Sequence, residues 1–381
     1  MNFSERTGRK KSQSDSAGSV VELLQSLVRI PSVNPDGNPG TEKIGEKACA
    51  EFVGAFLERS GARVEFQNVM PDRPNVIGKF PTNAAGKPRL IFAPHTDTVS
   101  IVGMTIAPFD AELRDGKIFG RGAADTKGPM AAMLWALWEM REEIPKLSHE
   151  IWFAGLAGEE AGQHGAKAFV AAHRADFALI GEPTSCDIVY THKGAVWLTL
   201  HTRGVAVHAS TPDCGENAIY KMNDAIRWLR EDLAPELARL NDRVLGAPTI
   251  NVGTISGGSK TNIVPDFCEA TVDIRTIPSQ DTQKLIDQIR THMSYAEVSA
   301  IYSHPLRTDA SHPLIHALEK SGGKCTGAPW FCDAAIFAEA GIPAVAAGPG
   351  SIAQAHTNDE WIAIDELRRG VDFYRSFLSN L

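Results

Sequence analysis

The sequence predicts an α/β protein in which a mixed, mostly parallel sheet has helices on both faces and is interrupted by a smaller, ferredoxin-like α+β domain. Apolar strand-like runs alternate with helical stretches from residue 19 to about residue 192, which is typical of parallel sheets with helical connections. Residues 193–303 instead follow a β-α-β-β-α-β order, as in a ferredoxin-like unit. The first pattern returns at residue 304. A chain of 381 residues is also long for one core, so we expect one domain formed by residues 19–192 and 304–381, with a second inserted at 193–303.

Helices in the first part of the larger domain are predicted by apolar spacing and by residues that end helices. One is predicted over residues 19–29, before Pro31, and a second over residues 41–60, before Gly61, a residue favoured just past a helix end. A third is predicted over residues 129–142, with Pro129 in its first turn. Asp125 precedes it and is expected to open this helix, as N-cap aspartates do.

The remaining elements follow the same reasoning. In the inserted domain, strands are predicted over residues 196–202, 249–255 and 267–275, and helices over residues 217–233 and 280–294. Beyond it, helices are predicted over residues 312–321 and 333–340, then a strand over residues 342–347 and a last helix from Ile364. Residues 1–18 are basic and rich in Ser and Gly, so a disordered tail is predicted there.

Composition excludes several classes of function. Hydrophobic residues make up 43% and charged residues 22% of the chain, as in globular proteins. The net charge of −8 disfavours nucleic acids and anionic membranes as partners, although a local basic pocket could still bind an anionic substrate. No apolar run reaches the roughly 18 to 20 residues of a membrane span, and no signal-peptide core follows the basic N-terminus. The 6 cysteines lack CxxC spacing, so free thiols in a reducing cytoplasm are expected, with a zinc–thiolate site as the less favoured alternative.

Four of the apolar runs lead into side chains that commonly bind metal ions. The residues that follow these runs are His95 and Asp97, Glu159 and Glu160, Glu182, and His356. Asp125 adds a fifth acidic position near a helix start. Ligands gather outside the carboxyl ends of strands in open α/β sheets, so these side chains are expected to lie together. Imidazoles and carboxylates at one edge favour a pair of divalent ions, zinc first, and thus metal-assisted hydrolysis.

Each of these residues has a plainer interpretation when taken alone. The HxD motif also fits a surface turn, and paired glutamates are usually solvated. The chemical interpretation is that Asp97 orients the ring of His95 and that the two oxygens of Asp125 bridge two ions. Adjacent side chains point in different directions, so one of Glu159 and Glu160 can hold metal while the other serves as general base toward a metal-bound water.

Competing catalytic motifs are absent from the sequence. There is no GxSxG motif of a serine hydrolase. Residues 253–261 (GTISGGSKT) approach a phosphate-binding loop, but the GxxxxGK[ST] spacing fails because Ser259 separates Gly258 from Lys260. No GxGxxG follows a predicted strand.

Several longer motifs make the chain resemble the M20-type zinc aminoacylases and carboxypeptidases, the group of acetylornithine deacetylase, succinyl-diaminopimelate desuccinylase and glutamate carboxypeptidase. The resemblance covers residues 20–381. It rests on PHTDTV (94–99), GRGAADTKG (120–128), GEE (158–160), GEPTS (181–185), VHAS (207–210), GGSKTNIVPD (257–266), DIR (273–275) and GPGSIAQAHTNDEW (348–361).

The resemblance implies a role for each matching residue. One Zn²⁺ is held by His95 and Glu182, and the other by Glu160 and His356. Asp125 bridges both ions and Asp97 orients His95. A zinc-bridging water attacks the substrate, and Glu159 is the general acid/base. The resemblance also implies that His208 stabilises the oxyanion, often across a dimer interface, and that Asn262 and Arg275 bind substrate, with Arg275 gripping a carboxylate.

The resemblance further implies two Zn²⁺, with Co²⁺ or Mn²⁺ as substitutes, a homodimer formed through the inserted lid domain, and a small N-acyl amino acid or short peptide as substrate. GEPTS, residues 191–194 and GPGSIAQAH favour acetylornithine deacetylase-like activity. A desuccinylase, an M20 carboxypeptidase or dipeptidase, and a non-catalytic binding protein remain alternatives. One departure stands out, because Thr126 and Pro129 replace the family's DMKGG or DMKGS pattern.

Overall fold

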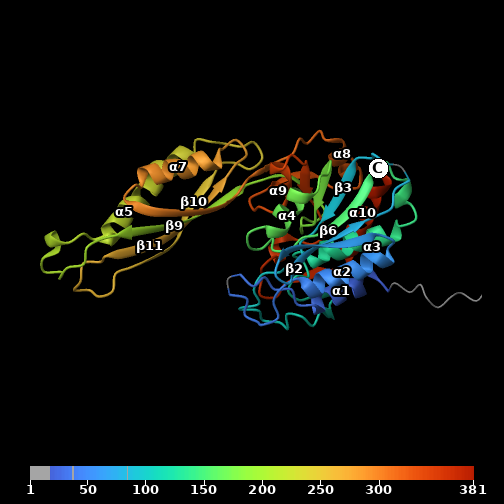
Figure 1. Cartoon of the computed structure of the whole chain (residues 1–381), viewed down its shortest axis with the longest axis horizontal. Helices are drawn as coiled ribbons and strands as arrows, with labels where there is room; N and C mark the ends of the chain where they lie inside the picture. Colours follow the sequence, from blue (N-terminus) through green and yellow to red (C-terminus); the bar gives the residue numbers. More distant parts are fainter. Residues whose placement is uncertain (1–17, 37, 84) are drawn as a thin grey trace, which may run out of the picture.

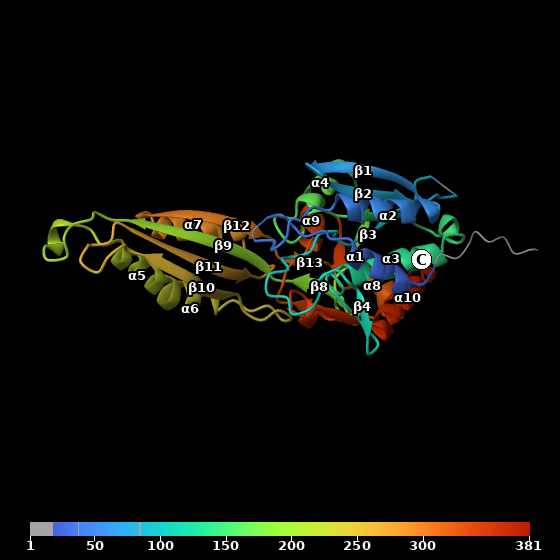
Figure 2. The same ribbon diagram turned by 90° about the horizontal axis from the view of Figure 1, so that it is seen from below.

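The structure is a computed structural model that describes residues 18–36, 38–83 and 85–381. The predicted disordered tail, residues 1–18, lies outside the described residues except for Gly18. The molecule has two lobes along its long axis (Figure 1), and a view turned by 90° shows the same division (Figure 2). The smaller lobe contains the elements from β9 (Gly194–Arg203) to β12 (Ala296–Ser303).

The larger lobe is built on a nine-stranded mixed sheet. Its strand order is β1-β2-β6-β3-β7-β15-β8-β13, with β14 paired to β8. The central strands β6, β3, β7 and β15 run parallel, and antiparallel pairs flank them on both sides. The strands are β1 (Arg63–Met70), β2 (Arg73–Lys79), β3 (Arg89–Ala93), β6 (Glu150–Gly155), β7 (Phe177–Ile180), β8 (Ile188–His192), β13 (Leu306–Arg307), β14 (Cys325–Ala328) and β15 (Ala344–Ala346). The predicted α/β class with a mixed sheet is confirmed.

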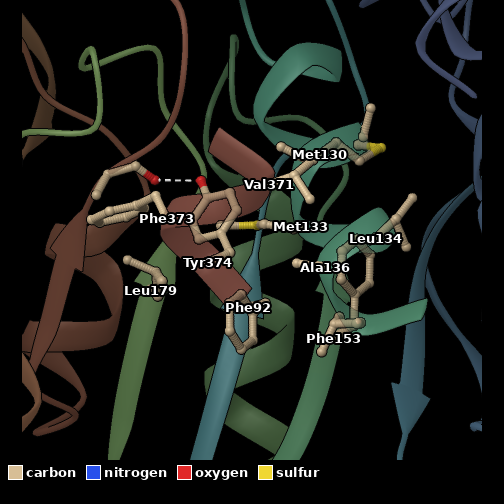
Figure 3. Close-up of a cluster of buried hydrophobic side chains, with 14 of the residues drawn as sticks. Phe92, Met130, Met133, Leu134, Ala136, Phe153, Leu179, Val371, Phe373 and Tyr374 are labelled. Carbon is tan, nitrogen blue, oxygen red and sulfur yellow. Dashed lines mark hydrogen bonds between the residues drawn. The ribbon is translucent and has the colours of Figure 1, made fainter. Parts of the chain in front are cut away.

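Helices cover both faces of this sheet. Side chains alternate along β3, so Leu90 and Phe92 enter one core while Ile91 and Ala93 enter the other. The first core is covered by α1 (Val20–Arg29), α2 (Lys47–Arg59), α3 (Lys127–Glu139), α8 (Pro313–Lys320) and α10 (Ile364–Ser379), and the second by α4 (His164–Ala172) and α9 (Ala334–Glu339). In the first core, side chains of β3, α3 and α10 meet, and the hydroxyl of Tyr374 donates to the carbonyl of Ala347 (Figure 3).

A small sheet packs against the first core through the buried Ile118 and Ile362. It is antiparallel, with the order β16-β5-β4, and contains β4 (Glu112–Arg114), β5 (Lys117–Phe119) and β16 (Trp361–Ala363). It pairs the segment just before the Asp125 loop with the segment just after His356. Two regions that are far apart in the sequence are thereby held together beside the predicted site.

The smaller lobe has the predicted β-α-β-β-α-β order. Its antiparallel sheet has the strand order β10-β11-β9-β12, and its main elements are β9, α5 (Ala218–Trp228), β10 (Thr249–Gly257), β11 (Phe267–Thr276), α7 (Thr282–His292) and β12. Val196, Leu198 and Leu200 of β9 share one core with α5 and α7. The intervening Trp197 is 45% exposed. Both helices therefore cover one face of the sheet, and the other face is left open.

Some helix ends differ from the prediction. The helix predicted from residue 41 begins only at Lys47, because Gly45 has a φ of 87° and its N–H donates to the carbonyl of Val33 at 2.9 Å instead of entering a helix. The third helix begins at Lys127 with Thr126 at its N-cap, so the prediction that Asp125 opens this helix is wrong. The helix predicted over residues 217–233 is confirmed to Trp228 and then continues through a π-helical turn, Leu229–Leu233, into α6 (Ala234–Leu237).

None of the helices in the described part of the chain is long and apolar enough to cross a membrane.

Candidate metal centre

His95 and Asp97 lie just beyond the carboxyl end of β3. The Nδ1 atom of His95 is 3.0 Å from the backbone carbonyl oxygen of Asp97 and 3.5 Å from its carboxylate. The carbonyl is therefore the closer partner, and the carboxylate lies on the same side of the ring. Both oxygens favour a proton on Nδ1, so the Nε2 atom is left as a metal ligand.

The carboxylate of Asp97 also fixes the turn that carries the paired glutamates. It accepts hydrogen bonds from the backbone N–H groups of Glu159 at 3.0 Å and Glu160 at 3.1 Å, and from the side-chain amide of Asn34 at 2.8 Å. Asp97 is completely buried. It therefore positions the histidine and the glutamate turn together.

Asp125 lies between the two histidines. Its Oδ1 atom is 3.1 Å from Nε2 of His95, and its Oδ2 atom is 3.4 Å from Nε2 of His356. Each carboxylate oxygen thus faces a different imidazole. This is the arrangement that a carboxylate bridging two ions requires.

Two groups of candidate ligands share Asp125. His95, Asp125 and Glu182 form one, and Asp125, Glu160 and His356 form the other; the ligand atoms within each lie within 4.8 Å of one another. Nε2 of His356 is also 3.1 Å from Oε2 of Glu160. The structure brings together all five predicted metal ligands.

The donor atoms fit a pair of divalent cations. Oε1 of Glu160 and Oε1 of Glu182 are buried and have no hydrogen-bond partner among the described residues. A buried, unpaired carboxylate oxygen is costly, and a metal ion would satisfy both atoms. The mixed nitrogen and oxygen donors suit Zn²⁺, Co²⁺ or Mn²⁺. The candidate groups found among the described residues contain no cysteine.

The buried carboxylates of the site would need positive charge nearby in order to be ionised. Burial raises the pKa of Glu159 well above its usual range, and the nearby charge of His95 lowers that pKa only in part. Burial does the same to the pKa of Glu182, and the charge of Asp125 adds to the effect. Hydrogen bonds to Asp125 and Glu160 raise the pKa of His356 to about 10. These carboxylates can all ionise together only with cations among them.

A cavity of about 490 Å³ opens over the candidate ligands, between the two lobes. It is lined by Asp125, Glu159, Glu160, Glu182, Trp197, Arg275, Trp330, Phe331, Ile352, Ala355 and His356. Arg275 therefore faces the same space as Glu159, and it is held by Asp273 at 2.8 and 3.0 Å. A larger groove of about 910 Å³ near Lys43 and Asp72 contains none of the candidate ligands.

His208 and Asn262 lie elsewhere on the smaller lobe. They are neighbours, since the N–H of Ala209 donates to the carbonyl of Asn262 at 3.0 Å. His208 is exposed, and its Nδ1 is 2.7 Å from the hydroxyl of Ser210. Neither residue lines the cavity. Their predicted roles in oxyanion and substrate binding remain predictions.

Two supporting groups were missed by the sequence reasoning. Glu360 is buried and accepts hydrogen bonds from the backbone N–H groups of Gly122, Ala124 and Asp125 at 2.8 to 3.0 Å. Asp333 is buried beside the site and accepts from Gln163 at 3.3 Å; burial raises its pKa to about 7. The one usable signal for Glu360 was its position four residues after His356.

The departure from the family motif lies beneath the site and does not line the cavity. The hydroxyl of Thr126 donates to the backbone carbonyl of Gly181, the residue before Glu182. Thr126 is completely buried, so it joins the Asp125 loop to the end of β7. Pro129 lies in the first turn of α3, where a missing N–H is tolerated.

Comparisons with known proteins agree with this geometry. The profile of peptidase family M20/M25/M40 matches residues 91–380. Acetylornithine deacetylase of Proteus mirabilis (strain HI4320) is 33% identical over 90% of this chain and 91% of its own length. The M20 metallo-carboxypeptidase Sso-CP2 of Sulfolobus solfataricus has a TM-score of 0.78 at 20% identity, covering 95% of this chain and 98% of that one. Bacillus subtilis YxeP, described as a dinuclear metal-binding peptidase of the M20 family, has a TM-score of 0.66 at 14% identity over 94% and 96% of the two chains.

The profile match covers most of the chain, and the curated relative matches nearly all of it. The fold, the shared ligand groups and these matches lead to one conclusion. The chain belongs to peptidase family M20/M25/M40 and is a metal-dependent hydrolase.

Proposed function

We propose that this chain is a cytoplasmic di-zinc amidohydrolase that removes the acyl group from an N-acyl amino acid, as acetylornithine deacetylases do. The observation that carries the proposal is the pair of ligand groups sharing Asp125, with Glu159 facing the same cavity. The 33% identity to an acetylornithine deacetylase supports a deacylase over a peptidase.

In this proposal His95 and Glu182 would hold one ion, Glu160 and His356 would hold the other, and Asp125 would be shared by both sites. When bound, the ions supply Lewis acidity that polarises the scissile carbonyl and lowers the pKa of water. The carboxylate of Glu159 accepts a proton from the attacking water and passes it to the leaving nitrogen. The cavity brings Glu159 and Arg275 together, so a substrate carboxylate bound at Arg275 places its amide near Glu159.

We also propose that residues 19–192 and 304–381 form the catalytic domain and residues 193–303 a lid that mediates a homodimer. Trp197 and Arg275 of the smaller lobe line the cavity together with residues of the larger lobe. Movement of the lid would therefore change the cavity. His208 is proposed to reach a reacting carbonyl oxygen only after closure or from a partner subunit.

The experiment is a hydrolysis panel with zinc-loaded protein. Free amine released from N-acetyl, N-succinyl and dipeptide substrates is measured before and after metal chelation. The Glu159→Gln variant should keep its metal and lose at least about 10²-fold in turnover. The exposed Glu58→Gln is the matched control and should behave as wild type. Preferential cleavage of dipeptides would replace the deacylase assignment with a peptidase, and normal turnover by Glu159→Gln with metal bound would refute the role of Glu159.

A further inference from the structure

Part of the lining of the cavity is aromatic and aliphatic. Trp330 and Phe331 come from the larger lobe, Trp197 from β9 of the smaller lobe, and Ile352 from the loop before His356. We call these four residues the aromatic wall. Trp330, Phe331 and Trp197 are each partly exposed, so their rings have surface available for a ligand.

The rings of the aromatic wall are held in place from behind. Trp197 lies edge-on to Phe331 with ring centroids 5.8 Å apart, and its indole N–H donates to Asp273 at 3.0 Å. Trp330 lies 6.3 Å from the ring of His192 at an angle of 30°. His192 is completely buried, and burial lowers its pKa to about 4, so it packs as a neutral ring. In this arrangement of the lobes, the three rings of the wall are supported by neighbours from both lobes.

The charges around the cavity disfavour a cationic side chain beside the aromatic wall. Among the described lining residues, the only carboxylates are Asp125, Glu159, Glu160 and Glu182 of the metal centre, and the one cation beyond that centre is Arg275. An ammonium group placed against the aromatic wall would find only the metal-centre carboxylates Glu159 and Glu160, which would be engaged by the metal site, and would lie near the Arg275 guanidinium. The Asp273 carboxylate beside Trp197 already accepts hydrogen bonds from that indole N–H and from the Arg275 guanidinium. Asp187 lines a neighbouring groove that shares Trp330 and Ile352 with the cavity.

We propose that the substrate is an N-acyl amino acid with a neutral, aromatic or large aliphatic side chain, held against the aromatic wall, and that N-acylornithine is a poor substrate. This inference rests on the proposed deacylase function and narrows it. Phe331 is the main specificity-determining residue, because it touches both Trp197 and the space over Arg275, with the Arg275 guanidinium carbon 5.8 Å from its ring centroid. Ring faces and edges pack well against another aromatic side chain.

The test compares kcat/KM for N-acetyl-L-phenylalanine, N-acetyl-L-leucine and N-acetyl-L-ornithine on the zinc-loaded full chain. The phenylalanine derivative is expected to exceed the ornithine derivative by at least about tenfold, since even one methylene in an apolar pocket is worth roughly 10- to 200-fold. Phe331→Asp should invert this preference by placing a carboxylate in the aromatic wall, while Phe331→Leu should keep the order of leucine over ornithine. Phe66→Leu, on exposed strand β1, is the matched control. A wild-type preference for the ornithine derivative would overturn the inference. If Asp187→Asn abolishes that preference, the ornithine ammonium group binds in the neighbouring groove.

A binding measurement separates this inference from the proposed function. Calorimetric titration of the zinc-loaded Glu159→Gln variant with the same compounds reports affinity without turnover. If the wild type hydrolyses neither compound, the deacylase proposal fails; tighter binding of the phenylalanine derivative by about tenfold would still support the aromatic wall. Equal or tighter binding of the ornithine derivative would overturn it.

Discussion

Glu360 offers the sharpest structural prediction, because one buried carboxylate holds the loop that carries Asp125. Its Oε2 atom accepts from the Arg121 guanidinium at 2.8 Å and from the N–H of Gly122 at 2.9 Å, and its Oε1 atom accepts from the N–H groups of Ala124 and Asp125 at 2.8 and 3.0 Å. In Glu360→Gln one of these oxygens is replaced by the NH2 group of the side-chain amide. That group cannot accept from the two donors that face it.

The expected loss in the free energy of unfolding follows from the hydrogen-bond donors that Glu360→Gln leaves without an acceptor. Each buried donor that loses its acceptor costs about 1–3 kcal/mol, and the buried Arg121 also loses its counter-ion, a loss worth about 3–5 kcal/mol by itself. Arg121 keeps its hydrogen bond to the Ser100 carbonyl at 3.0 Å, and such terms overlap. We therefore expect Glu360→Gln to lower the free energy of unfolding by about 3–5 kcal/mol and to weaken zinc binding by about 10- to 100-fold.

Urea denaturation followed by circular dichroism measures the first quantity, and competition with a chromogenic zinc chelator measures the second. The neighbouring, exposed Asp359→Asn is the matched control and should stay within about 0.5 kcal/mol of wild type. If Glu360→Gln unfolds as the control does and binds zinc normally, the carboxylate does not hold the loop and the reasoning is refuted.

Three further predictions follow from other parts of the site. Thr126→Val removes the donor to the buried Gly181 carbonyl and should lower the free energy of unfolding by about 1–3 kcal/mol in the same urea assay; an unchanged value would show that this bond is dispensable. The pKa of His192 is lowered to about 4 in the folded chain, whereas an unfolded histidine has a pKa of about 6.5. The unfolded chain therefore binds more protons between pH 6.5 and pH 4, and over that range the wild type should lose about 3 kcal/mol of stability relative to His192→Gln. Parallel pH–stability curves for the two proteins would contradict this. His208→Ala should lower kcat far more than it changes KM or zinc content, and mixing it with Glu159→Gln should restore activity if His208 acts across a dimer. Proven subunit exchange without any recovery would place His208 within its own subunit or outside catalysis.

Much of the site could be predicted because its ligands follow buried strands. His95 comes two residues after β3, and Glu182 two residues after β7. Parallel strands bring such positions to one edge of the sheet, so the local sequence pattern and the expected topology were sufficient to predict that these ligands lie together. The ferredoxin-like order of the smaller lobe was equally readable, since its strands alternate cleanly and Asn217 and Asp281 cap its helices.

The supporting contacts could not be predicted, because they join residues that are distant in the sequence. Glu360 binds a loop more than 230 residues earlier, and its position four residues after His356 does not show which group it would bind. The spacing of residues 41–46 fits a helix, but the bond from the Gly45 N–H to the Val33 carbonyl holds this segment in another conformation, and the helix starts only at Lys47. Asp125 fits an N-cap by spacing alone, yet its carboxylate faces two histidines that only the fold brings together. Tertiary contacts overrode local preference in each case.

The number of zinc ions bound per chain tests the central claim most directly. Protein freed of metal by chelation, reloaded with Zn²⁺ and passed through gel filtration is analysed for zinc, and its amide hydrolysis is measured on the same sample. The account predicts about two zinc ions per chain in the wild type, fewer in Asp125→Asn because the shared bridging carboxylate is lost, and hydrolysis that returns with the metal. Zinc at background level in the wild type, or hydrolysis that persists undiminished after complete metal removal, would contradict it.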